Sequence, residues 1–205
     1  MPGSSPRASA ATSASASRSF GRTPGSAASS ALLVLLLACD RRAATDLVGR
    51  PVDPLATAAP ATVLLFVDPS CPISNRYVPE ILRLAERFSQ RGARFFWVYP
   101  NASAGADAIR AHARAYGLGG EILRDTAHAL VRRSGAEVTP EAALFDAHGA
   151  LVYRGRIDDR HVDFGRSRPE PTRRDLELAL GELLDGRRVT VARSTAVGCA
   201  IPPLE

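Results

Sequence analysis

The sequence predicts an α/β domain, a central mixed sheet flanked by helices, because strand-like and helix-like patterns alternate along the chain. Residues 61–67 form a continuous apolar run, which is typical of a central strand buried on both faces. An amphipathic stretch follows, and residues 93–99 form a second apolar run. A helix between two such strands implies a parallel, right-handed crossover.

The next segments continue this alternation. The first helix is predicted from about Asn75 to a stop at Gly92. Its inward face would carry Tyr77, Val78, Ile81, Ala85 and Phe88. A second helix is predicted over residues 107–116, with an inward face of Ile109, Ala113 and Tyr116. A short strand over residues 121–124 and a helix over residues 126–133 follow.

The pattern in the last third of the sequence predicts two strands and a helix. The strands cover residues 142–145 and 150–153, and Gly149 suits the left-handed position of the hairpin loop between them. Residues 156–171 are polar and predicted to be irregular. A capping box at residues 172–175 would start the final helix, whose inward face carries Leu176, Leu180, Leu183 and Leu184.

The first 38 residues predict a signal peptide of the lipoprotein type. Residues 1–30 are mostly Ser, Ala, Gly, Pro and Arg, and eight apolar residues follow, which are too few to span a bilayer. That run ends Leu36-Leu37-Ala38-Cys39, which resembles the bacterial lipobox, in which the cysteine is lipid-modified and becomes the mature N-terminus. Cys39 would then be the only membrane attachment. The alternative is an ordinary buried apolar segment.

These signals divide the chain into four parts: a signal peptide over 1–38, a tether over 39–60, a domain over 61–186 and a C-terminal tail over 187–205. The expected location is outside the cytoplasm of a Gram-negative type cell, anchored in a membrane and facing the periplasm or outer surface. Removal of Cys39 leaves Cys71 and Cys199 in an exported domain, where disulfides persist.

The charge argues against a nucleic-acid partner. The formal net charge is +5, but Arg7, Arg18 and Arg22 lie in the predicted signal, and without them it falls to about +2. All 26 basic residues are arginine, and no basic patch interleaved with aromatic residues accompanies them.

Cys71 is the strongest candidate for chemistry, because it stands between a buried strand and a helix. Backbone N–H groups and the helix dipole favour a thiolate there, and Pro72 suits the first helical position. Cys71-Pro72-Ile73-Ser74 is a Cys-x-x-Cys motif with Ser74 in place of the second cysteine. Pro140, which enters a strand after Thr139, is a candidate cis proline. The alternative for Cys71 is a buried structural cysteine.

Together these residues resemble the thioredoxin-like superfamily, specifically its redoxin branch (AhpC/TSA-type, TlpA-like), over about residues 45–190. The resemblance implies a thioredoxin-like fold with a helical insertion before the cis proline. It also implies a thiol–disulfide oxidoreductase or related antioxidant redoxin without a cofactor or metal. Its partners would be a thiol or disulfide protein substrate and an external thiol reductant. In this superfamily the cis proline lies against the active-site cysteine, which leaves the backbone of Thr139 free to pair with a bound polypeptide.

Ser74 cannot resolve a mixed disulfide, so another thiol must do so. Cys199 is the only internal candidate, and Gly198 before it permits a close backbone approach. We expect the tail to fold back over the domain so that Cys199 resolves Cys71. The alternatives are an unpaired cysteine and a permanent structural disulfide that fixes the tail to the domain.

Two other functions stay open. A thiol peroxidase of the AhpC/TSA type shares the fold, but its pattern places Pro and Thr where this chain has Leu64 and Asp68. Arg76 is close enough in sequence to be considered as a group that polarises a peroxide, and the alternative for it is a solvated arginine on the helix surface. The other is a non-catalytic module that keeps the fold and uses its groove to bind a protein or metal partner. A copper carrier would need a second cysteine near Cys71 and a histidine, which only Cys199 and His161 could supply.

Overall fold

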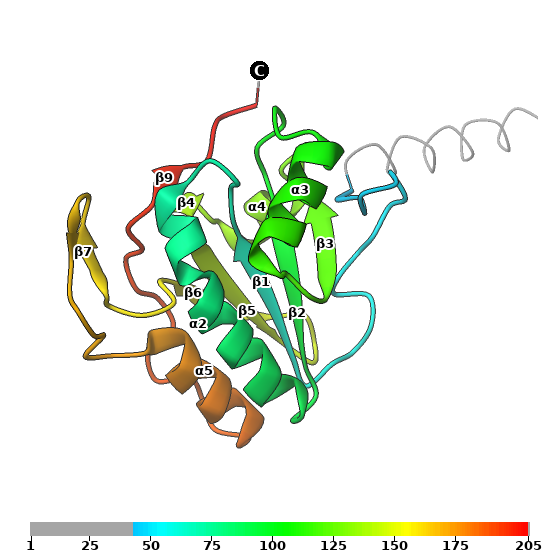
Figure 1. Cartoon of the computed structure of the whole chain (residues 1–205). Helices are drawn as coiled ribbons and strands as arrows, with labels where there is room; N and C mark the ends of the chain where they lie inside the picture. The colour runs from blue at the N-terminus through cyan, green and yellow to red at the C-terminus, as the bar shows by residue number, and fades with distance from the viewer. Residues whose placement is uncertain (1–42, 205) are drawn as a thin grey trace, which may run out of the picture.

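The computed structural model describes residues 43–204, and a five-stranded mixed sheet forms its centre (Figure 1). The strand order is β3–β2–β1–β5–β6, in which β1, β2 and β3 run parallel while β5 pairs antiparallel with both β1 and β6. The strands are β1 (Ala61–Phe66), β2 (Ala93–Tyr99), β3 (Glu121–Arg124), β5 (Glu141–Asp146) and β6 (Leu151–Gly155).

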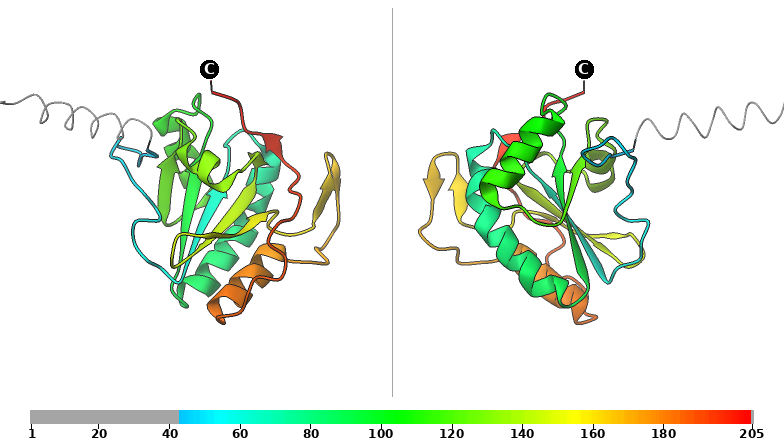
Figure 2. Two further views of the ribbon diagram at one scale, coloured as in Figure 1. Left: turned by 180° about the vertical axis from the view of Figure 1, so that it is seen from behind. Right: turned by 45° about the vertical axis from the view of Figure 1, so that its right-hand side comes forward.

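Helices cover both faces of this sheet. They are α2 (Pro72–Ser89), α3 (Ala106–Tyr116), α4 (Ala129–Ser134) and α5 (Asp175–Leu184). Figures 1 and 2 show α2, α3 and α5 on one face and α4 on the other. Alternate side chains of the buried strand β1 contribute to the hydrophobic cores on both faces of the sheet. Val63 and Leu65 pack with Ile81 of α2, whereas Leu64 and Phe66 pack on the α4 side. The predicted α/β class and the order of its main elements are therefore confirmed.

Residues 43–60, assigned to the tether, lie against the domain. Thr45 pairs with Arg124 at the edge of β3, with N–O distances of 2.9 and 2.7 Å. Ala44 is buried, and Val52 and Leu55 pack on the α4 side of the sheet. The predicted signal peptide and Cys39 lie outside the described residues. Among the residues that are described, no helix is both long and apolar enough to cross a bilayer.

The polar segment 156–171 was predicted to be irregular, and this prediction was wrong. It contains a hairpin of β7 (His161–Asp163) and β8 (Arg166–Ser167), which projects beside α2 in Figure 1. Asp159 closes the segment by accepting the N–H groups of Thr172 and Arg173. The Thr172 hydroxyl also donates to Asp159, so the predicted capping box at the start of α5 does not form.

Helix α4 begins at Ala129, three residues later than predicted. Asp125, four positions earlier in the sequence, caps this helix with its side chain. The buried Asp125 carboxylate accepts hydrogen bonds from the N–H groups of Ala129, Leu130 and Val131 at 2.7 to 2.9 Å. His128 adopts a left-handed conformation immediately before the helix.

We expect Asp125→Ala to destabilise the fold by about 2–3 kcal/mol, because it leaves buried helix N–H groups without an acceptor. Urea unfolding followed by circular dichroism measures this change. Asp107→Ala, which removes an exposed carboxylate from the first turn of α3, is the matched control and should leave the unfolding midpoint in place.

Candidate functional site

Cys71 lies at the N-terminus of α2, directly after the turn that leaves β1. Its side chain is 1% exposed, and its N–H donates to Asp68 O at 3.1 Å. Pro72 occupies the first helical turn, where its missing N–H has no cost. The sequence positions this cysteine by two local features, the end of a buried strand and the helix-starting proline.

The Thr139–Pro140 peptide bond is cis, as predicted, and it lies against Cys71. The Cys71 thiol donates to the carbonyl oxygen of Thr139 at 3.0 Å. Thr139 ends the short strand β4 (Val138–Thr139) immediately before β5. The cis turn thus brings a backbone carbonyl onto the candidate nucleophile.

The C-terminal tail folds back over the domain and brings a second thiol to this point. Strand β9 (Cys199–Ala200) pairs antiparallel with β4, with Thr139 opposite Cys199. The sulfur atoms of Cys71 and Cys199 lie 2.8 Å apart although 128 positions separate them in the sequence. Both thiols are free, so this is a reduced dithiol in hydrogen-bond contact.

The edge of β4 is therefore occupied, whereas the sequence led us to expect Thr139 to be free for a bound polypeptide. Gly198 explains the close fit. A Cβ atom on Gly198 would lie 2.3 Å from the carbonyl oxygen of Thr139, a distance that no side chain tolerates. Because only glycine fits against the cis turn, the tail itself takes the place of an extended peptide.

A second set of contacts fixes the tail further upstream, along the free edge of β6. The Arg154 N–H donates to Ala192 O at 3.0 Å, and the Ser194 N–H donates to Arg154 O at 3.1 Å. The Ser194 hydroxyl also lies 2.7 Å from the Tyr153 hydroxyl and accepts the Arg156 N–H at 3.2 Å. Two anchors, at β6 and at β4, thus hold the segment that carries Cys199.

The two thiols differ in acidity. Burial raises the pKa of Cys71, but the hydrogen bond from Cys199 and the neighbouring polar groups of Ser74 outweigh it, so the pKa falls below the ordinary value. Burial and the hydrogen bond to Cys71 raise the pKa of Cys199 to about 11. Cys71 is therefore the thiol that ionises first, and Cys199 keeps its proton and donates it to the Cys71 sulfur.

This difference predicts a two-step titration of the reduced protein. Thiolate absorbance should rise first below the pH at which a free cysteine ionises, and again near pH 11. Ser74→Ala should move the first step to higher pH, because it removes a neighbouring hydroxyl that favours the thiolate. A single step at the ordinary cysteine pKa would contradict the assignment of Cys71 as the more acidic thiol.

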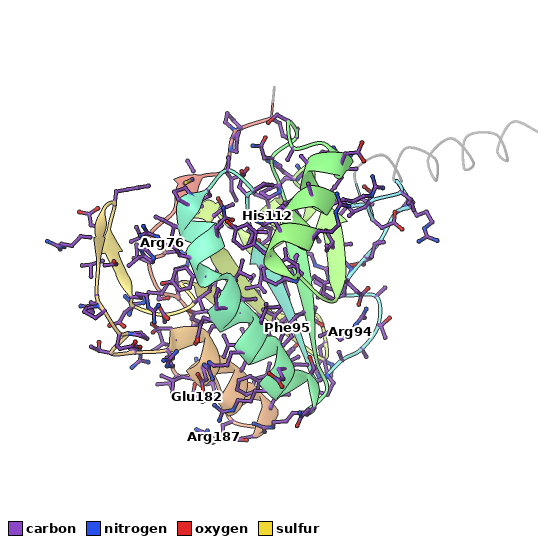
Figure 3. All side chains as sticks on the ribbon, in the orientation of Figure 1. Arg76, Arg94, Phe95, His112, Glu182 and Arg187 are labelled. Atoms are coloured by element: carbon purple, nitrogen blue, oxygen red, sulfur yellow. The ribbon has the colours of Figure 1, made fainter. Side chains whose placement is uncertain are left out.

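Sequence reasoning missed a buried hydrogen-bond network that supports the loop before Cys71. The Tyr99 hydroxyl lies 2.8 Å from His112 Nδ1, and His112 Nε2 lies 2.9 Å from Asn75 Oδ1. Because the Asn75 oxygen only accepts, Nε2 carries the proton and the Tyr99 hydroxyl donates to Nδ1. Asn75 in turn donates to Pro69 O at 3.1 Å. Figure 3 shows His112 between α3 and α2.

Asp68 is the other group that sequence reasoning did not assign to the site. Its carboxylate accepts hydrogen bonds from the Ser70 N–H at 2.8 Å and from Asn101 Nδ2 at 2.9 Å. It occupies the position where the peroxidase pattern has threonine, and Leu64, where that pattern has proline, is buried in the core. These contacts give Asp68 the role of fixing two loops beside Cys71.

His161 lies near Cys199 on the wall of a shared cavity, and its ring packs on Tyr77 with the centroids 5.3 Å apart. Within residues 43–204, no three histidine, cysteine or acidic side chains are grouped so that they could hold a metal ion. The geometry brings together Cys71, Cys199, Thr139, Pro140 and Ser74, with His161 at the margin.

Comparison with known proteins supports the fold and identifies no family. No family model matches the sequence, and no curated protein does. Among solved structures, a thiol:disulfide interchange protein of the thioredoxin family from Chlorobium tepidum TLS is similar, with a TM-score of 0.51 and 14% identity over 68% of this chain and 90% of that one. The fold is thioredoxin-like.

Two solved structures resemble this thioredoxin-like chain more strongly. An uncharacterized conserved protein from Geobacillus kaustophilus has a TM-score of 0.67 and 26% identity over 78% of this chain and 87% of its own. A hypothetical protein from Sinorhizobium meliloti 1021 has a TM-score of 0.65 and 25% identity over 78% and 91%. The predicted thioredoxin-like fold class is thus confirmed.

Proposed function

We propose that this protein is a thiol–disulfide oxidoreductase in which Cys71 is the nucleophile and Cys199 the resolving thiol. One observation carries the proposal: the two sulfur atoms lie 2.8 Å apart on a thioredoxin-like fold whose motif lacks its second cysteine. The lowered pKa of Cys71 gives further support, because attack on a disulfide needs a thiolate and Cys71 is the thiol that ionises first.

The proposed reaction runs in two steps. The Cys71 thiolate attacks one sulfur of a substrate disulfide, which forms a mixed disulfide at Cys71 and releases one substrate thiolate. Cys199 then loses its proton and attacks Cys71 Sγ, which closes the Cys71–Cys199 disulfide and releases the second substrate thiolate. Two electrons pass from the dithiol to the substrate, and an external thiol returns them to the protein in the next cycle.

The tail controls access to this reaction. A polypeptide that pairs with Thr139 as an extended strand must displace β9, because Cys199 and Ala200 already occupy that edge. Displacement moves Cys199 away while the mixed disulfide forms, and redocking returns it to Cys71. Gly198 allows the redocked tail to reach contact distance.

The test is an exchange assay with a disulfide-bonded peptide and a thiol reductant, run beside a hydrogen peroxide arm. The proposal predicts turnover of the peptide disulfide that depends on Cys71. Peroxide consumption without disulfide exchange would instead support the thiol peroxidase function. Slow, stoichiometric reaction of both substrates would support a binding module.

We also propose that the protein is exported and anchored by a lipid at Cys39. The lipobox-like residues are the basis of this proposal. The expected result in the native host is that the wild-type chain incorporates labelled fatty acid and fractionates with membranes. Cys39→Ser should lose both properties, whereas Cys71→Ser should keep them. Unchanged fractionation of Cys39→Ser would overturn the anchor.

A further inference from the structure

A cavity of about 230 Å³ lies beside Cys199 and has no role in the exchange step described above. One wall is the first turns of α2, with Pro72, Ile73 and Arg76, and the opposite wall is the β7–β8 hairpin, with His161 and Phe164. Figure 3 shows Arg76 on the side of α2 that faces this hairpin.

The polar groups of this cavity are suited to an anion. No acidic residue lines it, and the first turn of α2 carries no acidic side chain that would offset the positive end of the helix dipole. Arg76 is exposed and has no ion-pair partner within residues 43–204. The nearby carboxylate of Asp158 is buried and already accepts hydrogen bonds from the Tyr77 hydroxyl and the Arg160 N–H.

His161 provides the second, independent sign of a ligand. Its side chain is only 7% exposed, yet the imidazole makes no hydrogen bond with any described residue. It lines the cavity with its ring against Tyr77. Its ring nitrogens are not fully enclosed by the protein, and an acceptor in the cavity would pair with the imidazole N–H group.

Only one of the two cysteines lines the cavity. Cys199 lines it and is partly exposed, whereas Cys71 is 1% exposed and covered by the cis turn and the tail. A small molecule in the cavity therefore meets Cys199 first. It does so without displacing β9 from β4, which a polypeptide must do.

We propose, on the basis of the function above, that this cavity binds a small thiol that carries a carboxylate, and that this thiol reduces the Cys71–Cys199 disulfide by attacking Cys199. Arg76 and the His161 N–H hold the carboxylate, and Phe164 covers the apolar part of the ligand. The external reductant is thus a low-molecular-weight anionic thiol, and it enters by a route separate from that of a polypeptide substrate.

The reduction balances in two steps. The first thiolate forms a bond to Cys199 Sγ while the Cys71–Cys199 bond breaks, and Cys71 leaves as a thiolate. Cys71 is the better leaving group because its pKa is the lower of the two. A second thiolate attacks the ligand sulfur of the mixed disulfide, which releases Cys199 to take up a proton and yields the oxidised ligand. Two small thiols thus supply the two electrons.

The first test compares three probe thiols on the oxidised protein at equal thiolate concentration: 3-mercaptopropionate (anionic), 2-mercaptoethanol (neutral) and cysteamine (cationic). We expect 3-mercaptopropionate to react about fivefold faster than 2-mercaptoethanol, which is the scale of one partly exposed ion pair. Arg76→Gln should remove this preference, and Arg114→Gln, which removes the same charge from α3, should keep it. Equal rates for all three thiols in the wild type would overturn the proposal.

The second test locates the mixed disulfide. Acid quenching during reduction by 3-mercaptopropionate, followed by peptide mapping, should find the adduct on Cys199. An adduct on Cys71 would overturn the proposed route while leaving the exchange function intact, because turnover with the neutral dithiol dithiothreitol reports that function separately. A protein that never forms the Cys71–Cys199 disulfide would overturn both proposals.

Discussion

Replacement of Cys71 by serine should abolish disulfide exchange. We expect the rate to fall by roughly three orders of magnitude or more, as is usual when an enzyme loses its only nucleophile. The hydroxyl of serine stays protonated at neutral pH and does not attack a disulfide sulfur. The measurement is turnover of a disulfide-bonded peptide by the purified variant, with a thiol reductant in excess.

Cys199→Ser is the matched control, since it removes the other sulfur and keeps the nucleophile. Without added thiol, this variant should release one substrate thiol per protein molecule and then stop as a mixed disulfide at Cys71. Both variants should unfold at the wild-type urea concentration under reducing conditions. Turnover by Cys71→Ser at more than about a tenth of the wild-type rate, far above the loss expected for a missing nucleophile, would contradict the assignment.

Replacement of Gly198 by alanine should uncouple the two thiols without removing either. The new Cβ atom would meet the Thr139 carbonyl at 2.3 Å and the Pro140 nitrogen at 3.1 Å, both of which are backbone atoms that have little room to move. The tail must therefore leave the edge of β4. We expect the equilibrium constant for closing the Cys71–Cys199 disulfide to fall by about a hundredfold, because the effective concentration of Cys199 falls.

A glutathione redox titration of the variant measures that constant. Gly181→Ala is the control, because its Cβ atom on α5 meets nothing within 4 Å and the redox equilibrium should stay unchanged. Alkylation of Cys71 by iodoacetamide should also be faster in Gly198→Ala, since the tail no longer covers the thiol. A wild-type equilibrium constant in Gly198→Ala would show that the docked tail is not what pairs the cysteines.

The sheet and its main helices could be predicted from the sequence because their signals are local. The apolar run of β1 and the periodicity of α2 each specify one element, and the proline after Thr139 marks the cis turn. The β7–β8 hairpin could not be predicted, because Asp159 closes it through contacts with Thr172 and Arg173 further along the chain. Polar residues that are held by distant partners resemble a solvated loop in sequence.

Only the part of the candidate site that has a local sequence signal could be predicted. Cys71 stands in a local pattern, and Cys199 was chosen as the one remaining thiol of the domain. The occupation of the Thr139 edge depends instead on the fit of Gly198 against a cis peptide bond, which no local pattern encodes. The Tyr99–His112–Asn75 network joins three separate elements, and a histidine on a helix gives no sign of such partners.

The central claim, that Cys71 and Cys199 form a reversible redox couple, is tested most directly by peptide mapping under non-reducing conditions across a glutathione redox titration. The account predicts a single Cys71–Cys199 linkage that opens within the range of potentials that glutathione buffers cover. A linkage that survives strong reductant would make the tail a structural staple. Two thiols that stay free at every potential would contradict the resolving role of Cys199.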